Sequence, residues 1–527
     1  MYRDFDERLA LLESSGFADR LSAGRKGVEK ESLRVTADNK LAQTPHPAAL
    51  GAALTHPYIT TDYSEAQLEF VTPPLEDVRD VMAFQHELHQ FTYAHLTDEF
   101  LWSASMPCIV AGEQSVPVAR FGPSHVGRFK HVYRRGLEAR YRRIMQIISG
   151  VHFNYSVPLE LWPVLQEIEH DPRPQGDFMS DAYLGLARNV MRYDWLITYL
   201  FGCSPALCKS FMDGLPHTFQ EYDRYSFYEP FATSLRMSNI GYKNQASALL
   251  NVSYDSLPGY VNALTHAVRT PYPPYQEIGV FVDGDYRQLN ANILQIENEF
   301  YGSIRPKQIT APGERPLSAL ARRGVAYVEL RSLDVNAFEP VGVSEEQLRF
   351  LEAFLLFCLL QDSAPLSPHE KAESAQNQTL TAHEGRRPGL KLQRNGRSIR
   401  LAEWATTILA RVADVAALLD RGDEAQRYGQ AVAGLQATVY DPDLTPSARA
   451  LAAMRAGNHS FFAFAGELAH GHRAAFTTRP LTARQNQLFT ALAEESLRKQ
   501  ADLEAATTGS FAAFLADYAA QLNPARV

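Results

Sequence analysis

The stretch from Gly27 to Val35 has the alternating pattern of a β-strand, in which successive side chains point to opposite faces of a sheet. Glu29 and Glu31 would therefore share one face and lie about 7 Å apart along the strand. Two carboxylates at this spacing repel each other unless a positive group or a bound cation lies between them. An isolated pair of this kind is most often an exposed strand end of mixed charge, so its meaning depends on the rest of the chain.

Three later segments predict strands of the same kind, at 66–72, 151–157 and 325–333. Each strand places acidic, amide or imidazole groups on one face and apolar side chains on the other. This alternation is typical of an antiparallel sheet with one face on the core and the other in solvent. We therefore expect an α+β fold whose mostly antiparallel sheet gathers glutamates and a histidine on its polar face.

Apolar residues at helical spacing predict helices around this sheet. The predicted helices lie at 6–22, 76–97, 128–148, 180–212, 343–361, 401–420, 424–439, 446–456 and 483–506, with a polar loop at 363–400. The later helices are rich in alanine and leucine. We therefore divide the chain into a catalytic sheet core with its surrounding helices at 1–365, and a polar loop and helical region packed on that core at 366–527.

The composition indicates a soluble protein from a reducing compartment. The chain has 527 residues, 45% of them hydrophobic, which is enough for a large core. Its net charge is −9, whereas a general nucleic-acid binder would carry an excess of basic residues. Its four cysteines include no C-x-x-C pair. The N-terminus has charges where a signal peptide needs an apolar run, and the longest apolar run, 354–360, is too short to cross a bilayer. We expect a cytoplasmic monomer with neither nucleic acid nor a membrane as a partner.

The acidic residues of the predicted strands form a candidate metal site. The candidate ligands are Glu29, Glu31, Asp62, Glu69, His152 and Glu329. A set dominated by carboxylates suits Mg²⁺ or Mn²⁺, whereas zinc would favour cysteines or several histidines. Mg²⁺ ions beside arginines are typical of phosphoryl transfer, and Arg134, Arg236, Arg305 and Arg331 are available for phosphate or carboxylate groups. The residues alone predict a Mg²⁺-dependent, phosphate-handling enzyme.

Each of these candidates also has an ordinary structural explanation. A histidine within an apolar strand, such as His152, is more often a hydrogen-bonded core residue. Tyr133, Tyr242 and Tyr301 can be packing residues, and Arg134 can belong to the solvated face of a basic helix.

The sequence has no P-loop motif, which excludes a P-loop enzyme, and no G-x-G-x-x-G after a strand, which counts against a Rossmann dinucleotide site.

Several motifs resemble those of the proteobacterial glutamate–cysteine ligases (γ-glutamylcysteine synthetases). They are GVEKESLRV (27–35), LTH (54–56), TTDY (60–63), LEF (68–70), ISGVHFNY (148–155), ATSLR (232–236), LQIENE (294–299), IRPK (304–307), ELRSLD (329–334) and EGRRPGL (384–390). The resemblance covers most of the chain but is loose after about residue 400. Departures are mild: Tyr63 stands where the family often has phenylalanine, and Lys26 where arginine is common.

The resemblance implies a fold similar to glutamine synthetase and the guanidino kinases, with a curved sheet that forms a funnel wrapped by helices. It implies that ATP is used to join the γ-carboxylate of L-glutamate to the amine of L-cysteine through γ-glutamyl phosphate, as the first step of glutathione biosynthesis. Matching positions imply roles for the candidate residues. The six candidate ligands would hold Mg²⁺, Arg236 and Arg331 would act on the glutamate and the transferring phosphoryl group, and Tyr133, Arg134, Tyr242, Tyr301, Asn154 and Arg305 would bind substrates.

Three other functions remain open at this point. A carboxylate–amine ligase that accepts a different amine would need the same metal and ATP machinery. A regulatory protein could keep the fold without the chemistry, although the complete set of candidate ligands argues against it. A thiol-based enzyme would need Cys108 or Cys203 as nucleophile with a base nearby.

Overall fold

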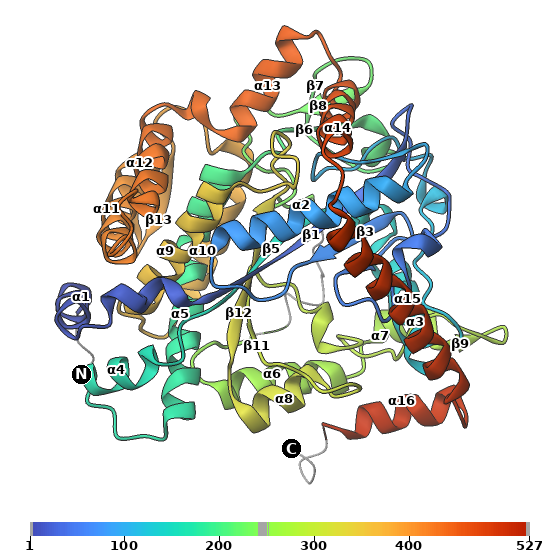
Figure 1. Ribbon diagram of the computed structural model, residues 1–527, viewed down its shortest axis with the longest axis horizontal. Coiled ribbons are helices and arrows are strands. Elements are labelled where there is room, and N and C mark those ends of the chain that lie inside the picture. Colours follow the sequence, from blue (N-terminus) through green and yellow to red (C-terminus); the bar gives the residue numbers. More distant parts are fainter. Residues whose placement is uncertain (1–3, 241–249, 251, 523–527) are drawn as a thin grey trace.

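A computed structural model describes residues 4–240, 250 and 252–522, and a seven-stranded sheet lies at its centre (Figure 1). The strands are β1 (Arg25–Thr36), β2 (Ile59–Thr61), β3 (Gln67–Val71), β4 (Glu99–Leu101), β5 (Gly150–Ser156), β11 (Ile304–Lys307) and β12 (Tyr327–Asp334). Their order is β11-β12-β5-β1-β3-β2, and β4 pairs with the end of β1. The strands pair in the antiparallel sense throughout this sheet, which confirms the predicted α+β class.

Strand β1 lies in the middle of the sheet and sets the register of its neighbours. Glu31 lies opposite Glu69 of β3, and Glu29 lies opposite His152 of β5. Since partners directly across an antiparallel pair project to the same face, these four side chains share one face, as the alternation predicted.

The helices surround this sheet. They are α1 (Phe5–Ser14), α2 (Val78–His95), α3 (His125–Tyr141), α4 (Leu161–Ile168), α5 (Gln175–Phe201), α6 (Leu257–Arg269), α7 (Pro273–Ile278), α8 (Pro316–Arg323), α9 (Glu345–Leu360), α10 (Pro368–Glu384), α11 (Leu401–Leu419), α12 (Arg427–Tyr440), α13 (Pro446–Ala456), α14 (Phe461–Thr478), α15 (Ala483–Ala505) and α16 (Phe511–Ala520). Three small sheets pair β6 (Ala206–Cys208) and β7 (Gln220–Glu221) with β8 (Ser226–Tyr228), β9 (Phe281–Val282) with β10 (Asp285–Tyr286), and β13 (Lys391–Arg394) with β14 (Arg397–Arg400). Across the described ranges, the structure has no helix that combines the length and the apolar character required to cross a membrane.

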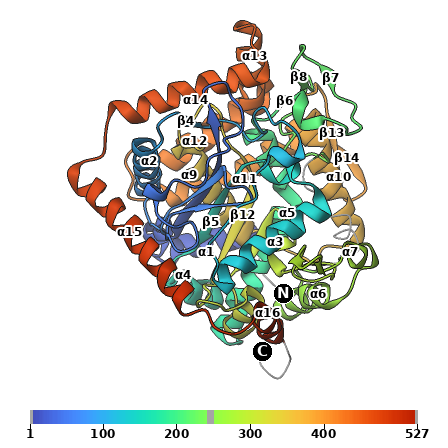
Figure 2. The same ribbon diagram turned by 90° about the vertical axis from the view of Figure 1, so that its right-hand side faces the viewer.

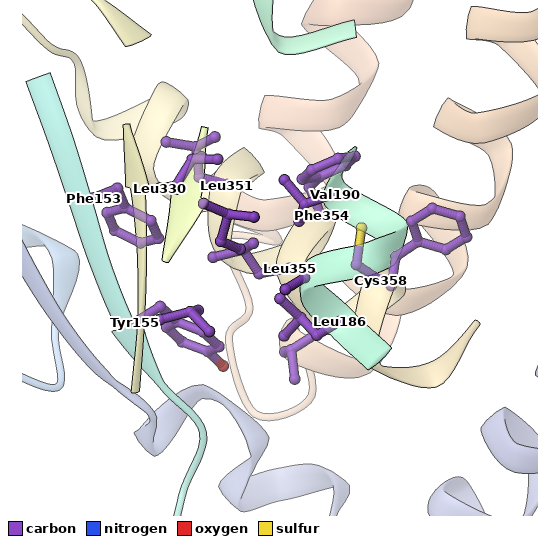
Figure 3. Packing of buried hydrophobic residues seen from close by; sticks show 14 of the residues in the cluster. Phe153, Tyr155, Leu186, Val190, Leu330, Leu351, Phe354, Leu355 and Cys358 are labelled. Atoms are coloured by element: carbon purple, nitrogen blue, oxygen red, sulfur yellow. The ribbon is translucent and has the colours of Figure 1, made fainter. Parts of the chain in front are cut away.

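The apolar face of the sheet packs against α9 and α5 (Figure 3). Phe153 and Tyr155 of β5 and Leu330 of β12 point toward the two helices and are fully buried. Helix α9 begins with a capping box, in which the Ser344 and Gln347 side chains bind each other's backbone N–H groups. Burying one large apolar side chain contributes about 1.5–3 kcal/mol to the stability of the fold. The packed layer of side chains therefore stabilises the sheet against the two helices.

The same face of β1 also carries buried cations, which the alternation did not predict. Lys26 is fully buried, and its Nζ lies 2.8 Å from Oε1 of Glu352 on α9. Arg34 forms a 2.5 Å ion pair with Glu99 at the start of β4. Buried charges require such partners, so β1 is anchored by ion pairs as well as by apolar packing.

The C-terminal region packs on the core in two places (Figures 1 and 2). Helices α11 and α12 pack on α9. Helices α14, α15 and α16 follow the outside of the molecule in both views, and α14 and α16 pack on α2 and α3, respectively. The division of the chain at residue 365 stays a prediction.

Several predicted boundaries are wrong. The polar loop predicted at 363–400 contains α10 and the β13–β14 hairpin. Helix α10 starts at a Ser367 N-cap followed by proline, and its buried positions are mostly polar. The Asn377 side chain, for example, donates to the carbonyl of Gln393 in the hairpin. A helix of this kind has no apolar stripe, so apolar periodicity does not predict it. The helix predicted at 6–22 breaks into α1 and a 3₁₀ turn, and α14 and α16 were not predicted.

Candidate functional site

A cavity of about 550 Å³ opens on the polar face of the central sheet, a size typical of small-molecule sites. Strands β1, β3, β5 and β12 supply its floor, and α3 supplies one wall. The expectation that this face is solvated is wrong, because His152 and Glu329 are only 4% and 2% exposed. The polar face is instead the buried floor of a site.

Glu29, His152 and Glu329 form the central cluster of this floor. Nδ1 of His152 lies 3.1 Å from Oε2 of Glu29 and 4.0 Å from Oε1 of Glu329. One ligand atom from each of the three residues falls within 4.8 Å of the others. Asn154, two residues along β5, donates a 2.9 Å hydrogen bond to Oε1 of Glu29. The cluster therefore has the donor atoms and the spacing of a cation site.

Glu31, Asp62 and Glu69 line the neighbouring part of the cavity. Burial and then the charge of Asp62 raise the pKa of Glu31 to about 8. Burial and then the charges of Glu29 and Asp62 hold the pKa of Glu69 well above its usual value. Since like charges and burial both disfavour ionisation, this group of carboxylates needs positive charge to stay ionised.

The carboxylates of Glu29 and Glu329 differ from this group because cationic groups are near them. Burial opposes the ionisation of Glu329, but Lys307 and Arg331 hold its pKa well below the usual value. Nζ of Lys307 donates a 3.2 Å hydrogen bond to Glu329, and Nη1 of Arg331 lies 3.3 Å from the same oxygen. Burial also opposes the ionisation of Glu29, yet the hydrogen bond with His152 leaves its pKa lowered.

Arg236 and Arg331 reach the cavity together. Nη2 of Arg236 donates a 2.9 Å hydrogen bond to the backbone carbonyl of Arg331. The buried Asp334 carboxylate lies 3.9 Å from Nη1 of Arg236 and accepts hydrogen bonds from the hydroxyls of Ser204 and Ser234. Asp334 thus ties the segment that carries Arg236 to the end of β12, a role that the sequence did not reveal.

The predicted substrate residues fall into three groups. Tyr133, Arg134, Tyr301 and Arg305 line the cavity, Asn154 lies beside Glu29 outside the lining, and Tyr242 lies outside the described residues. The hydroxyl of Tyr301 lies 3.6 Å from the sulfur of Met237. The guanidinium of Arg134 donates to the backbone carbonyls of Asp62 and Lys130, so Arg134 also fixes the segment that carries Asp62.

Several lining residues are not among the candidates that the sequence pattern indicated. Lys307 follows Arg305 by two residues on β11 and therefore shares its face, which strand alternation alone could have predicted. Lys130 lies on α3, where burial lowers its pKa to about 8. Phe514 and Tyr518 reach the cavity from α16, nearly 400 residues along the chain from α3, and no local pattern could place them there.

The cysteines lie outside this site. Cys108 and Cys203 are buried in an apolar cluster and do not line the cavity. Burial raises the pKa of the Cys203 thiol to about 12 and that of Cys108 well above its usual value. A reactive thiol needs a lowered pKa and access, so the thiol-based alternative has no support in the structure.

The chain is similar to several known proteins. The family model described as glutamate–cysteine ligase matches residues 9–381. A glutamate–cysteine ligase from Azotobacter vinelandii is 51% identical over 522 residues, which cover 98% of both chains. One from Pseudomonas aeruginosa is 48% identical over 515 residues, with the same coverage of both chains.

Two solved structures are also similar. The structure of a glutamate–cysteine ligase from Francisella tularensis in complex with AMP matches with a TM-score of 0.89 and 35% identity, covering 94% of this chain and 97% of that one. A bifunctional glutathione synthetase from Pasteurella multocida matches with a TM-score of 0.75 and 26% identity, covering 92% of this chain and 58% of that one. With a family match over most of its length and relatives near half identity, the chain belongs to the glutamate–cysteine ligase family.

Proposed function

We propose that the protein joins the γ-carboxylate of L-glutamate to the amine of L-cysteine at the expense of ATP, forming γ-glutamylcysteine, ADP and phosphate. The observation that carries this proposal is the cluster of Glu29, His152 and Glu329 beside Arg331 and Lys307 on the floor of one cavity. Such a combination of anionic and cationic groups suits a reaction that brings a triphosphate and a carboxylate together.

The cluster fits a divalent cation with oxygen ligands. Oε2 of Glu329 and Oδ1 of Asn154 are buried acceptor atoms that receive no hydrogen bond within the described part of the chain. Glu29, His152 and Glu329 would hold one Mg²⁺ or Mn²⁺ ion, and Glu31, Asp62 and Glu69 would hold another. When bound, these ions neutralise the phosphate oxygens and polarise the phosphorus toward attack.

The side chains of the protein bind and orient the reactants. Arg331 and Lys307 would bind oxygens of the transferring phosphoryl group, and Arg236 would hold the γ-carboxylate of glutamate beside it. The carboxylate oxygen attacks the γ-phosphorus, the bond to the β-phosphate oxygen breaks, and ADP leaves. Tyr133, Arg134 and Tyr301 would place cysteine so that its amine attacks the acyl carbon, with loss of a proton and of inorganic phosphate. Arg305 and Asn154 would also help to bind the substrates. Asn154 would in addition hold Glu29, a candidate metal ligand, in place.

Four finer features belong to the same proposal. The sheet would curve into a funnel like that of glutamine synthetase, with its mouth at the cavity. The region after residue 365 would pack on the core as a second unit. We propose that the protein acts as a monomer in the cytoplasm, where its four buried cysteines, all free, would stay reduced.

The test is product formation by the purified protein. With ATP, Mg²⁺, glutamate and cysteine, we expect ADP release and a product of the mass of γ-glutamylcysteine, and little ADP without cysteine. If another amine supports faster turnover than cysteine at equal concentration, the protein is a ligase of different amine specificity. If no amine supports ADP release, the proposal is wrong.

A further inference from the structure

One rim of the cavity is mostly apolar, in contrast to its charged floor. It is lined by Val126 and Phe129 of α3, Ile296, Pro316, and Phe514 and Tyr518 of α16, and Glu314 near Pro316 is its charged member. The ring of Phe129 lies 4.7 Å from that of Tyr518 and 6.0 Å from that of Phe514, centroid to centroid. The C-terminal helix thus completes the cavity with an aromatic wall.

Helix α16 is held in this place at both of its ends. At its start, the ring of Phe511 packs against Tyr286 and under the guanidinium of Arg128. At its end, Gln521 accepts a hydrogen bond from the backbone N–H of Arg315 and donates one to the carbonyl of Gly313. Its outward positions include the exposed Ala512, Ala513 and Ala516. The two large aromatic side chains at the cavity are therefore on the inner side of a helix that is fixed to both α3 and the segment before α8.

We infer that α16 supplies the wall of the active site that binds the base of the nucleotide, with Phe514 and Tyr518 as the contacting residues. This inference rests on the proposed function. Among the three substrates, glutamate and cysteine are small and charged or polar, whereas the nucleotide alone carries a large planar aromatic group. Aromatic side chains bind such groups by stacking. Lys130 follows Phe129 directly on α3 and lines the same cavity, and it lies close enough to Glu69 and Asp62 for their charges to act on it.

The test distinguishes contacts to the base from contacts to the phosphates. Calorimetry measures the binding of Mg·ADP, and of Mg·tripolyphosphate, which has no base. Both ligands are titrated into the full-length wild-type protein and into the Phe514→Ala and Tyr518→Ala variants. A stacked base contributes enough that each variant should bind ADP about 5- to 100-fold more weakly. Binding of tripolyphosphate should stay within about twofold of wild type, since phosphate contacts are unchanged. In turnover, the KM for ATP should rise while the KM values for glutamate and cysteine stay the same.

Leu515→Ala is the matched control. Leu515 packs in the same cluster from the same helix but does not line the cavity. The inference is wrong if Leu515→Ala weakens ADP binding as much as the other two variants, if tripolyphosphate binding falls in parallel, or if ADP affinity does not change. Thermal unfolding of all variants checks that the helix remains docked. Wild-type protein that binds no ADP would instead overturn the proposed function, so the two failures are distinguishable.

Discussion

Glu29 and His152 lie directly opposite each other on neighbouring strands, and Nδ1 of the histidine is 3.1 Å from Oε2 of the glutamate. Because both strands are fixed by packing on their other face, this pair is held in place before any substrate binds. Glu329 joins the pair from the next strand. A preorganised group of this kind is most useful where charge develops in the transition state.

The first prediction concerns these carboxylates. Glu29→Gln or Glu329→Gln should lower kcat at least about 10²-fold, the usual effect of removing a preorganised electrostatic group. A metal chelator should abolish turnover. Steady-state ADP release measures both effects, and Asp38→Asn, an exposed carboxylate, is the control. A near-normal rate from either glutamine variant would show that these carboxylates hold no metal.

The second prediction concerns Asp334 as a positioning residue. Its carboxylate binds the Ser204 and Ser234 hydroxyls and lies near Arg236. Asp334→Asn should lower kcat about 10-fold and raise the KM for glutamate, as for other supporting groups, with the KM for ATP unchanged. If Asp334→Asn only lowers the thermal midpoint and leaves the KM for glutamate at its wild-type value, the residue is purely structural and the assigned role is contradicted.

The third prediction concerns the buried ion pair of Lys26 and Glu352. Lys26→Met leaves the Glu352 carboxylate buried without its partner, which should cost about 3–5 kcal/mol of unfolding free energy. Changing both residues, to methionine and glutamine, should cost less than the single change, because no charge stays unpaired. Urea denaturation of the four proteins gives the coupling energy. Additive effects would mean that the pair does not couple.

The fourth prediction concerns acid stability. Burial lowers the pKa of His56 to about 4, and its Nδ1 accepts hydrogen bonds from the backbone N–H groups of Tyr58 and Ile59. Below about pH 6.5 the unfolded chain takes up a proton that the folded chain takes up only near pH 4. Stability should therefore fall between these values as the pH falls. In His56→Gln, the proton uptake on urea unfolding in this range should decrease by about one, and an unchanged uptake would contradict the assignment.

Strand alternation predicted most of the floor of the site. Glu29, Glu31, Glu69, His152 and Glu329 were identified because a two-residue period is a local property of the chain, and antiparallel pairing then brings equivalent faces together. The cations on the opposite face of β1 were not predicted to be buried, because their partners lie far along the chain. Lys26 needs Glu352, more than 300 residues later.

The walls of the site could not be predicted from local patterns. Asp334 has a role only because the segment of Ser234 and Arg236 folds back against β12. Helix α16 lines the cavity through contacts with α3. Helix α10 was not predicted for a different reason. Its buried positions are mostly polar and hydrogen-bonded, so the helix has no apolar periodicity.

We propose that the site activates glutamate by phosphoryl transfer before the amine attacks. This order of events is tested with glutamate labelled with ¹⁸O in its γ-carboxylate, in a reaction with ATP, Mg²⁺ and cysteine. We predict that mass spectrometry will find one labelled oxygen in the released inorganic phosphate, because the attacking carboxylate oxygen stays on phosphorus when the amide bond forms. If the released phosphate is unlabelled and the oxygen lost from the γ-carboxylate appears in water instead, the acyl-phosphate route and the roles of Arg236 and Arg331 are contradicted.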